Sequence, residues 1–490
     1  MKILLLNPPF LKKFSRPQRS PAVTKSGTLY FPMWLAYAAG VLMKDGFDVD
    51  LVDAPADGYV LYDIIEKAKK YQPDLIVLDT STPSIYNDIN VAGELKDTCP
   101  NAFVTLVGTH VSVLPEETLK IDNRIDAVAV HEYDYTILDL ANTLERGGNL
   151  QDILGLSFRQ NGKIVHNSRR PYIENLDELP FVSKVYKKFL NIKNYFNPNA
   201  LYPMVTIVTS RGCAFRCTFC VYPQTLMGRH FRLRSVDNVV NEMEYIVENF
   251  PQAKAIFFED DTLTANKKRC NELADSIIKR GVKISWTANA RVGLDLATMK
   301  KIKKAGCRLL CVGFESGSQI ILDNMKKNVK IDRMIEFMKN AKKTGILIHG
   351  CFMAGLPGET KETMKQTLEL AKRLKPDTAQ FYPVMVYPGT EAYDWYKERG
   401  LIATDDFSKW ITPGGLHNTV IRTEELSSEE LVRFCDDARR AFYLRPTYFF
   451  YKMKQMIFHP CEIKRTIKSA KTFFRYLAKG SDIPLGKTLK

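Results

Sequence analysis

Short runs of apolar residues alternate with amphipathic stretches along most of this chain. Within the first 145 residues, apolar runs at 2–6, 47–52, 74–78 and 102–107 have the length and composition of buried parallel strands. Helical spacing of apolar positions fills the intervals at 32–43, 59–71 and 85–98. This alternation predicts a doubly wound, Rossmann-like α/β domain over residues 1–145.

A second and longer alternation occupies residues 201–400. The candidate strands lie at 205–208, 255–258, 283–286, 309–314, 346–352 and 378–382, with helical stretches between them such as 236–248, 266–280, 331–344 and 361–374. Repeated strand–helix units of this kind predict a parallel barrel or partial barrel. In such barrels catalytic groups cluster at the carboxyl ends of the strands, so the residues after each apolar run are the candidates for a site.

The remaining segments differ in composition from these two domains. Residues 146–200 form a predicted linker, in which the turn Asn161-Gly162 indicates a small hairpin. Residues 401–490 are predicted to be helical and basic: from Arg439 onward, thirteen Lys and Arg stand against two acids, so most of the net charge of +15 is local. Aromatic residues interleave with these cations, which favours an anionic membrane surface. The alternatives are a solvated helical cap on the barrel and, less favoured, a nucleic-acid surface.

Length and cysteine usage limit the class of protein. The 490 residues exceed what one hydrophobic core accommodates, so we expect several domains. The sequence after Met1 lacks the pattern of a secretory signal, and no apolar run has the length of a membrane span. The ten cysteines are irregularly spaced, which favours a reducing cytoplasm over a disulfide framework.

Three cysteines fall within eight residues, in Thr209-Ser-Arg-Gly-Cys213-Ala-Phe-Arg-Cys217-Thr-Phe-Cys220. They follow the strand predicted at 205–208 and therefore lie on the loop that leaves its carboxyl end. Thiolates are the usual protein ligands of iron–sulfur clusters, and three of them leave one iron of a four-iron cluster open. A structural zinc site is the alternative, but it requires four ligands, usually from two separated pairs, and no second pair is spaced that way.

The C-x3-C-x2-C spacing, with Phe219 before the last cysteine, resembles the signature of the radical S-adenosylmethionine (SAM) superfamily. The resemblance implies a partial (β/α)6 barrel and a [4Fe-4S] cluster on Cys213, Cys217 and Cys220. It further implies that SAM chelates the open iron. An electron from a donor of flavodoxin or ferredoxin type would then cleave SAM to a 5′-deoxyadenosyl radical.

The resemblance also implies SAM contacts at positions that follow the predicted strands. These are Phe219, Glu259, Asp260, Asp261, Arg291, Glu315 and Gly355. The three acids are expected at the SAM amino group, and a guanidinium after the next strand could fork onto its carboxylate. The glutamate resembles the residue that binds the ribose hydroxyls, and the glycine lies in a segment similar to the one beside adenosine. Simpler alternatives are a solvated acidic loop, a surface arginine and a helix cap.

The first domain, placed directly before such a barrel, looks like the cobalamin-binding domain of B12-dependent radical SAM enzymes. The segment that begins Gly108-Thr-His-Val is similar to a stretch common in that class. Contacts are expected in loops at the carboxyl ends of strands, from Thr80, Ser81, Thr82, Gly108, Thr109 and His110. The Asp-x-His-x-x-Gly signature of many other cobalamin proteins is absent, as it often is from related methylases, and we expect neither His110 nor His131 to ligate cobalt. A domain that has lost its cofactor is the alternative.

Taken together, the chain resembles the B12-dependent radical SAM family that includes hopanoid methylases, the anaerobic magnesium-protoporphyrin ester cyclase, and C- and P-methylases of natural products. The resemblance implies radical attack on an unactivated C–H bond and methylation of a hydrophobic or natural-product substrate. Radical cyclisation, oxidation or coupling without methyl transfer remains open. A non-enzymatic iron–sulfur protein is also open, although electron carriers usually close the cluster with a fourth cysteine. The sequence names neither the substrate nor a catalytic residue.

Overall fold

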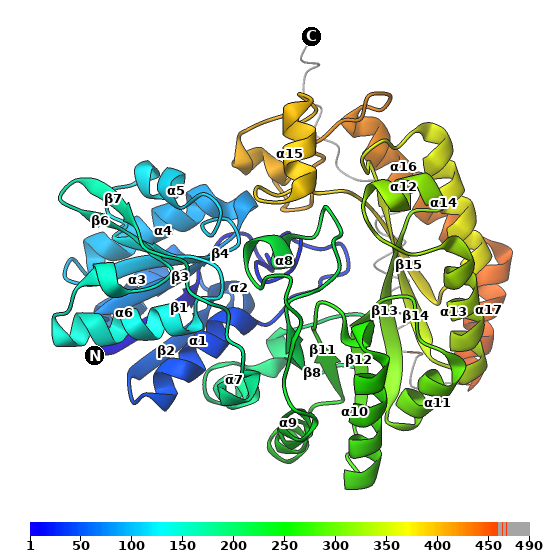
Figure 1. Cartoon of the computed structure of the whole chain (residues 1–490), viewed down its shortest axis with the longest axis horizontal. Coiled ribbons are helices and arrows are strands. Elements are labelled where there is room, and N and C mark those ends of the chain that lie inside the picture. The colour runs from blue at the N-terminus through cyan, green and yellow to red at the C-terminus, as the bar shows by residue number, and fades with distance from the viewer. Residues whose placement is uncertain (459–462, 464–466, 468–490) are drawn as a thin grey trace.

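The computed structural model describes residues 1–458, 463 and 467. Two sheets lie beside each other, the first in the blue and cyan part of the chain and the second in the green and yellow part (Figure 1). The end of the predicted basic segment, except Ile463 and Ile467, lies outside the described residues. Within the described part of the chain, no helix combines the length and the apolar character needed to cross a membrane.

The first sheet has seven strands in the order β2-β1-β3-β4-β5-β6-β7. The first five run parallel, and the last two form an antiparallel hairpin at the edge. The hairpin turns at Asn161-Gly162, whose φ angles of 51° and 75° confirm the predicted turn, and it extends the first sheet. The strands are β1 (Lys2–Asn7), β2 (Asp48–Asp53), β3 (Leu75–Thr80), β4 (Phe103–Gly108), β5 (Ala127–Ala129), β6 (Leu156–Gln160) and β7 (Lys163–His166).

Helices cover both faces of this sheet, which makes it doubly wound as predicted. Helices α1 and α6 pack together on one face, and α3 and α4 pack on the other. Strand β3 is buried along its whole length because both of its faces are covered, which explains its continuous apolar run. The helices are α1 (Met33–Lys44), α2 (Ala54–Asp57), α3 (Leu61–Tyr71), α4 (Ile85–Thr98), α5 (Pro115–Ile121) and α6 (Asp134–Arg146).

The second sheet has six parallel strands that follow one another in chain order and form a partial (β/α)6 barrel. Among the described residues its edge strands, β8 and β15, do not pair, so the barrel stays open. The strands are β8 (Met204–Ile207), β11 (Ala255–Phe258), β12 (Ser285–Ala290), β13 (Cys307–Glu315), β14 (Leu347–Ala354) and β15 (Thr378–Pro383). The helices around it are α9 (Val236–Asn249), α10 (Lys267–Arg280), α11 (Leu296–Lys304), α12 (Gln319–Asn324), α13 (Ile331–Thr344) and α14 (Lys361–Leu374).

Two connecting regions join the domains. Helix α7 (Val182–Phe189) contacts α1 of the first domain and α9 of the barrel, and it lies between them in Figure 1. The segment 8–32, which we call the strap, leaves the carboxyl end of β1 without forming a named strand or helix. The strap therefore begins at the edge of the first sheet where ligands of doubly wound domains bind.

The C-terminal part adds helices α15 (Glu391–Glu398), α16 (Ser428–Tyr443) and α17 (Pro446–Phe458), of which α16 and α17 lie on the outer side of the barrel near α13 and α14 (Figure 1). Helix α16 packs on β14, β15 and α14. The Tyr443 hydroxyl accepts a hydrogen bond from the Ala379 amide at 2.8 Å and lies 2.7 Å from its carbonyl, to which it can donate. This contact satisfies backbone groups of the edge strand that would otherwise be available to another chain.

Candidate active site

The cysteine loop begins at the carboxyl end of β8. Its first residues form β9 (Ser210–Arg211), which pairs with β10 (Arg232–Leu233). Gly212 has a φ of +80°, and a Cβ there would lie 2.1 Å from the His230 carbonyl oxygen, so only glycine fits this turn. The turn carries the chain directly into Cys213.

All three thiols of the loop are reduced and lie at the mouth of the barrel, with Cys213 and Cys217 buried and Cys220 half-buried. Burial, and next the nearby Asp261, raise the pKa of both the Cys213 and the Cys220 thiol. Free thiolates are therefore disfavoured here unless iron bonds to them. Three closely spaced thiols with this chemistry fit a cluster that keeps one iron open to a ligand.

The three acids after β11 do not act together. Asp260 accepts hydrogen bonds from the amide of Thr209 at 3.0 Å, from its hydroxyl at 2.8 Å and from the Ser210 hydroxyl at 2.5 Å. Asp260 therefore fixes the start of the cysteine loop, and its expected contact with SAM stays a prediction. Glu259 and Asp261 instead share one guanidinium, that of Arg19 in the strap.

Arg291, which follows β12, lies against the cysteine loop. Its Nη1 donates to the Cys217 sulfur at 3.6 Å, and its guanidinium carbon lies 3.9 Å from the centre of the Phe215 ring. The backbone amide of Arg291 donates to the Thr264 hydroxyl at 2.8 Å, which fixes the position of the chain. The side chain is a buried cation at the cluster loop, not an arginine on the solvent-exposed surface.

Glu315, at the end of β13, is buried and has a φ of 63°, an unusual backbone conformation for a residue other than glycine. Its Oε1 accepts from the Lys327 ammonium at 2.8 Å, whereas its Oε2 is buried and has no hydrogen-bond partner among the described residues. A buried carboxylate oxygen without a donor is costly. This oxygen therefore fits a ligand hydroxyl such as those of the SAM ribose.

We expect Gly313→Ala to weaken SAM binding by roughly tenfold or more, because the substitution displaces a charge-assisted contact. A Cβ at this position would lie 2.0 Å from Glu315 Oε1 and 3.0 Å from Lys327 Nζ. The measurement is the SAM concentration that changes the spectrum of the reduced cluster. Gly414→Ala is the matched control, because its Cβ would meet its nearest neighbour only at 3.8 Å. An unchanged SAM response in Gly313→Ala would contradict this role for Glu315.

Gly355 and Phe219 both make contacts within the protein that account for these residue types without a bound ligand. Gly355 has a φ of +83°, its amide donates to Glu359 at 2.5 Å, and a Cβ there would lie 2.8 Å from Leu431 of α16. Its carbonyl accepts from the Tyr396 hydroxyl. Phe219 is half-buried against the hydrophobic core. Gly355 therefore packs against α16, and its expected place in the segment beside adenosine stays a prediction.

The loops of the first domain meet the cysteine loop in a cleft. Thr80, Gly108 and Thr109 line one side of it, and Tyr222 and Leu226, just after Cys220, line the other. Polar loop groups of this kind can hydrogen-bond a polar cofactor, and the aromatic side offers a flat contact. The free space is about 10 Å³, no more than a water molecule needs. The residues of the cleft therefore fit the polar and aromatic contacts of a corrin, whereas the free space between them is smaller than a corrin needs.

Three of the predicted cobalamin contacts do not line this cleft. Ser81 bonds to the Ser84 hydroxyl at 2.7 Å, and the Nδ1 of His110 lies 3.2 Å from the Thr82 hydroxyl. The His110 ring also packs edge-on against Phe407, with centroids 4.9 Å apart. Burial lowers the pKa of His110 to about 3. These contacts hold the loops together from within the domain, and the expected contacts of these residues with cobalamin stay a prediction.

His131 also has a structural partner, since its Nδ1 donates to the Thr225 carbonyl at 2.8 Å. This bond joins the first domain to α8 (Val221–Thr225) after the cysteine loop. That neither histidine ligates cobalt stays a prediction.

A buried ion network fixes the cysteine loop to the first domain. Glu132, after β5, accepts from the Nη1 of Arg211 at 2.8 Å and from the Nη1 of Arg232 at 2.7 Å, so it holds both strands of the β9-β10 ribbon. Asp134 accepts from Arg211 at 2.7 Å, and the guanidinium of Arg211 lies over the Tyr37 ring. The four charged side chains are almost fully buried.

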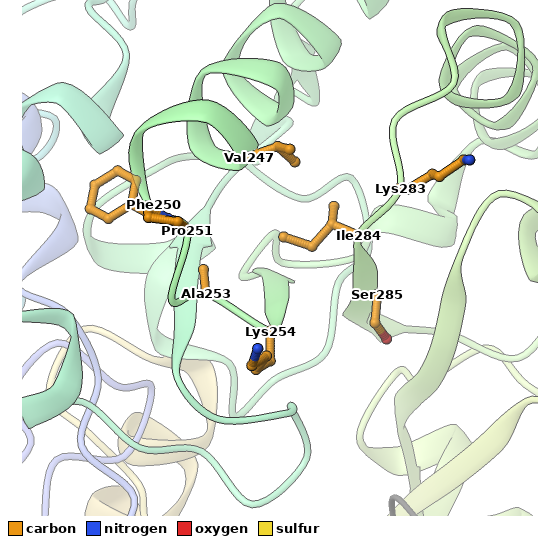
Figure 2. A pocket seen from close by; sticks show the side chains of 8 residues that line it. All are labelled: Val247, Phe250, Pro251, Ala253, Lys254, Lys283, Ile284 and Ser285. Carbon is orange, nitrogen blue, oxygen red and sulfur yellow. The ribbon is translucent and has the colours of Figure 1, made fainter.

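A separate hollow lies at the opposite end of the barrel. It has a volume of about 320 Å³ and is lined at the amino ends of β11 and β12, where Figure 2 shows Lys254, Lys283 and Ile284 around it. It is far along the strands from the cysteine loop, and it contains none of the predicted site residues. We therefore place the active site at the other end of the barrel, at the cleft.

The sequence did not reveal Arg19 or Lys327 as site residues. Arg19 lies in a basic, proline-containing loop 240 residues before its partner Glu259, and no local spacing pairs them. Lys327 follows a helix that shows no motif.

Comparisons with known proteins agree with this geometry. Residues 207–371 match the Radical SAM superfamily, and residues 19–141 match the B12 binding domain. The combination defines a B12-dependent radical SAM enzyme. The chain is 34% identical over 447 residues to an uncharacterized methyltransferase of Pyrococcus horikoshii, covering 91% of this chain and 93% of that protein. It therefore belongs to the family of radical SAM enzymes with a B12-binding domain, and its cofactors are a [4Fe-4S] cluster, SAM and cobalamin.

Further relatives differ in the reactions for which they are named. The chain is 28% identical to the anaerobic magnesium-protoporphyrin IX monomethyl ester cyclase of Cereibacter sphaeroides, covering 86% of this chain and 68% of that protein. The fold is similar to that of TsrM, a radical SAM methyltransferase of Kitasatospora setae, with a TM-score of 0.65, 18% identity, and coverage of 81% and 76% of the two chains. The relatives include both cyclases and methyltransferases. The individual reaction of this chain therefore has to be inferred from its site.

Proposed function

We propose that this enzyme abstracts hydrogen from an unactivated C–H bond and methylates the resulting carbon. The observation that carries the proposal is the shared cleft: Gly108 and Thr109 of the first domain face Tyr222 and Leu226, which directly follow the cysteine loop. When bound, the cluster and SAM supply the deoxyadenosyl radical, and cobalamin supplies the methyl group. The radical from SAM and the methyl group from cobalamin would then be supplied next to each other in the same cleft.

The side chains of the protein would position these groups. Cys213, Cys217 and Cys220 would hold the cluster, and Arg291 would place a cation against it. The free oxygen of Glu315 would orient the ribose. An external one-electron donor of flavodoxin or ferredoxin type is needed, because none of these groups supplies an electron.

The test is an anaerobic reaction of reconstituted protein with SAM, with and without cobalamin, using candidate substrates and mass spectrometry of the nucleosides. We expect 5′-deoxyadenosine and S-adenosylhomocysteine together, the second only with cobalamin. Deoxyadenosine without cobalamin-dependent S-adenosylhomocysteine would instead support radical cyclisation or coupling. S-adenosylhomocysteine without deoxyadenosine would exclude hydrogen abstraction.

We propose further that the substrate is hydrophobic and that the enzyme meets it at an anionic membrane surface, through α17. Phe450, Met453 and Ile457 occupy one face of this helix at spacings of three and four residues, and Phe450 and Ile457 are 68% and 74% exposed. Helix α17 contains no acidic residue. An apolar face on a helix that itself carries no acid is suited to the interface of an anionic bilayer.

The tertiary structure adds cations beside this face. The last turns of α13 and α14 carry Lys342, Lys343, Lys372 and Arg373. The Nη1 of Arg445 donates to the Lys372 carbonyl at 3.3 Å, which places the start of α17 at this end of the barrel. Lys372 pairs with Glu369 at 2.8 Å, so the other cations carry the charge that would complement anionic headgroups.

We expect the double variant Phe450→Glu, Ile457→Glu to bind vesicles of phosphatidylcholine and phosphatidylserine at least roughly tenfold more weakly than the unmodified protein, because two apolar anchors become charged. Co-sedimentation measures the effect. Ile320→Glu, at an equally exposed position (71%) on α12, is the control and should bind normally. Equal binding by the double variant and the control would contradict this surface.

A further inference from the structure

The strap is held by both domains and by the C-terminal part. Arg16 forms a buried ion pair with Asp88 of the first domain. The amide of Val23 donates to the Gly415 carbonyl at 2.7 Å, and Leu29 forms a bridge with Phe196. The strap therefore crosses the mouth of the barrel in a defined path, and Arg19 lies between its anchors.

Arg19 reaches from the strap into the acidic end of β11. Its Nη1 donates to Glu259 Oε1 at 2.5 Å, and its Nη2 donates to Asp261 Oδ1 at 3.2 Å. The same Nη2 lies 3.1 Å from the backbone carbonyl oxygen of Asp260 and 3.3 Å from that of Glu259. Its Nε makes no hydrogen bond with the described residues, so the guanidinium keeps a donor for another group.

The guanidinium also lies beside the cysteine loop. Its carbon is 5.3 Å from the centre of the Tyr222 ring, two residues after Cys220. The side chain remains 29% exposed although both of its carboxylate partners are buried. Arg19 is therefore a cation between the acids and the cluster, with one side still accessible from the barrel mouth.

The charges at this point match the amino-acid end of SAM, which carries one ammonium and one carboxylate. Glu259 and Asp261 bring two negative charges, of which Arg19 neutralises one. The remaining negative charge suits the ammonium, and the open Nε–H of Arg19 suits the carboxylate, since a guanidinium donates strong charge-assisted hydrogen bonds to carboxylates. The barrel alone supplies the acids but not this cation.

We propose that Arg19 of the first domain's strap completes the SAM site by binding the SAM carboxylate, so that SAM binds fully only when the strap is docked on the barrel. The proposal rests on the proposed function only in requiring SAM at the cluster. It explains why one residue of the N-terminal part is held by four contacts at the acidic end of β11, when domain docking is already provided by the Glu132 network.

The experiment titrates SAM into full-length, anaerobically reconstituted and reduced protein and follows the electron paramagnetic resonance spectrum of the cluster. We compare Arg19→Gln and Arg19→Lys with Lys25→Gln, which weakens another strap contact, the 3.6 Å ion pair with Asp436. Arg19→Gln should require roughly 10- to 100-fold more SAM for the same spectral change, the cost of one charge-assisted contact. Arg19→Lys should fall between, and Lys25→Gln should match the unmodified protein.

A normal SAM response in Arg19→Gln with an intact cluster would overturn the proposal. If that variant retains no cluster, Arg19→Lys decides. A response equal to that of the unmodified protein overturns the proposal, and a roughly threefold or larger weakening supports it, because a lysine ammonium has no donor at the position of the arginine Nε. An equal loss in Lys25→Gln would assign the effect to strap docking in general and would also overturn it. Failure of the unmodified protein to respond to SAM would be a failure of the proposed function itself.

Discussion

Protein in which Cys217 is replaced by alanine should form 5′-deoxyadenosine at least about 100-fold more slowly than the unmodified enzyme, because two thiolates cannot hold a four-iron cluster. Cys217 is buried, and its sulfur contacts Arg291. The same result is expected for Cys213→Ala and Cys220→Ala. Iron and sulfide content and deoxyadenosine, both measured after anaerobic reconstitution, test the prediction.

Cys99→Ala is the matched control for this loss. Cys99 is equally buried, but it lies in the first domain, where its sulfur contacts the Ala68 carbonyl at 3.7 Å. This variant should keep the cluster and the activity. If Cys217→Ala forms deoxyadenosine at the normal rate and keeps its cluster content, Cys217 is not a cluster ligand.

Glu132→Ala should lower the free energy of unfolding by about 3–5 kcal/mol, since it leaves the buried guanidinium of Arg232 without a carboxylate. Arg211 keeps Asp134 but loses one of its two acids. Because these arginines form the ribbon at the start of the cysteine loop, the variant should also retain less cluster and less cobalamin. Denaturant unfolding and metal analysis measure the two effects.

The pH dependence gives a second test of this network. Burial raises the pKa of Glu132, but Arg211 and Arg232 outweigh it and hold this pKa below its ordinary value of 4.5. A carboxylate whose pKa is depressed on folding stabilises the fold fully above its unfolded pKa, and this contribution is lost as the pH falls through the folded value. The unmodified protein should therefore lose its stability advantage over Glu132→Ala below about pH 4.5.

The control is Glu244→Ala, which removes an ion pair with Arg280 that is partly exposed to solvent. Such pairs contribute about 0–1 kcal/mol. Equal destabilisation by the two variants would show that the buried network has no special part in holding the domains.

The three acids after β11 show what a local sequence pattern predicts and what it leaves to the tertiary structure. The sequence placed them together at the end of a strand, where a site was expected, and that position is correct. Side chains alternate along an extended chain, so Asp260 points away from its neighbours and binds Thr209 and Ser210. Which acids remain for a ligand therefore depends on a loop 50 residues earlier in the chain.

The sequence by itself determined the alternation of strands and helices, the two sheets and the cysteine triad, because each depends on residues that are close together in the chain. Apolar runs specify strands locally, and Cys213, Cys217 and Cys220 need only one loop to meet. The tertiary structure alone decided which charges surround that loop. Arg19 meets Glu259, and Glu132 meets Arg211, because the first domain docks on the barrel, and no spacing in the chain encodes that proximity. Likewise, only the fold places Arg445, before α17, against Lys372 of α14.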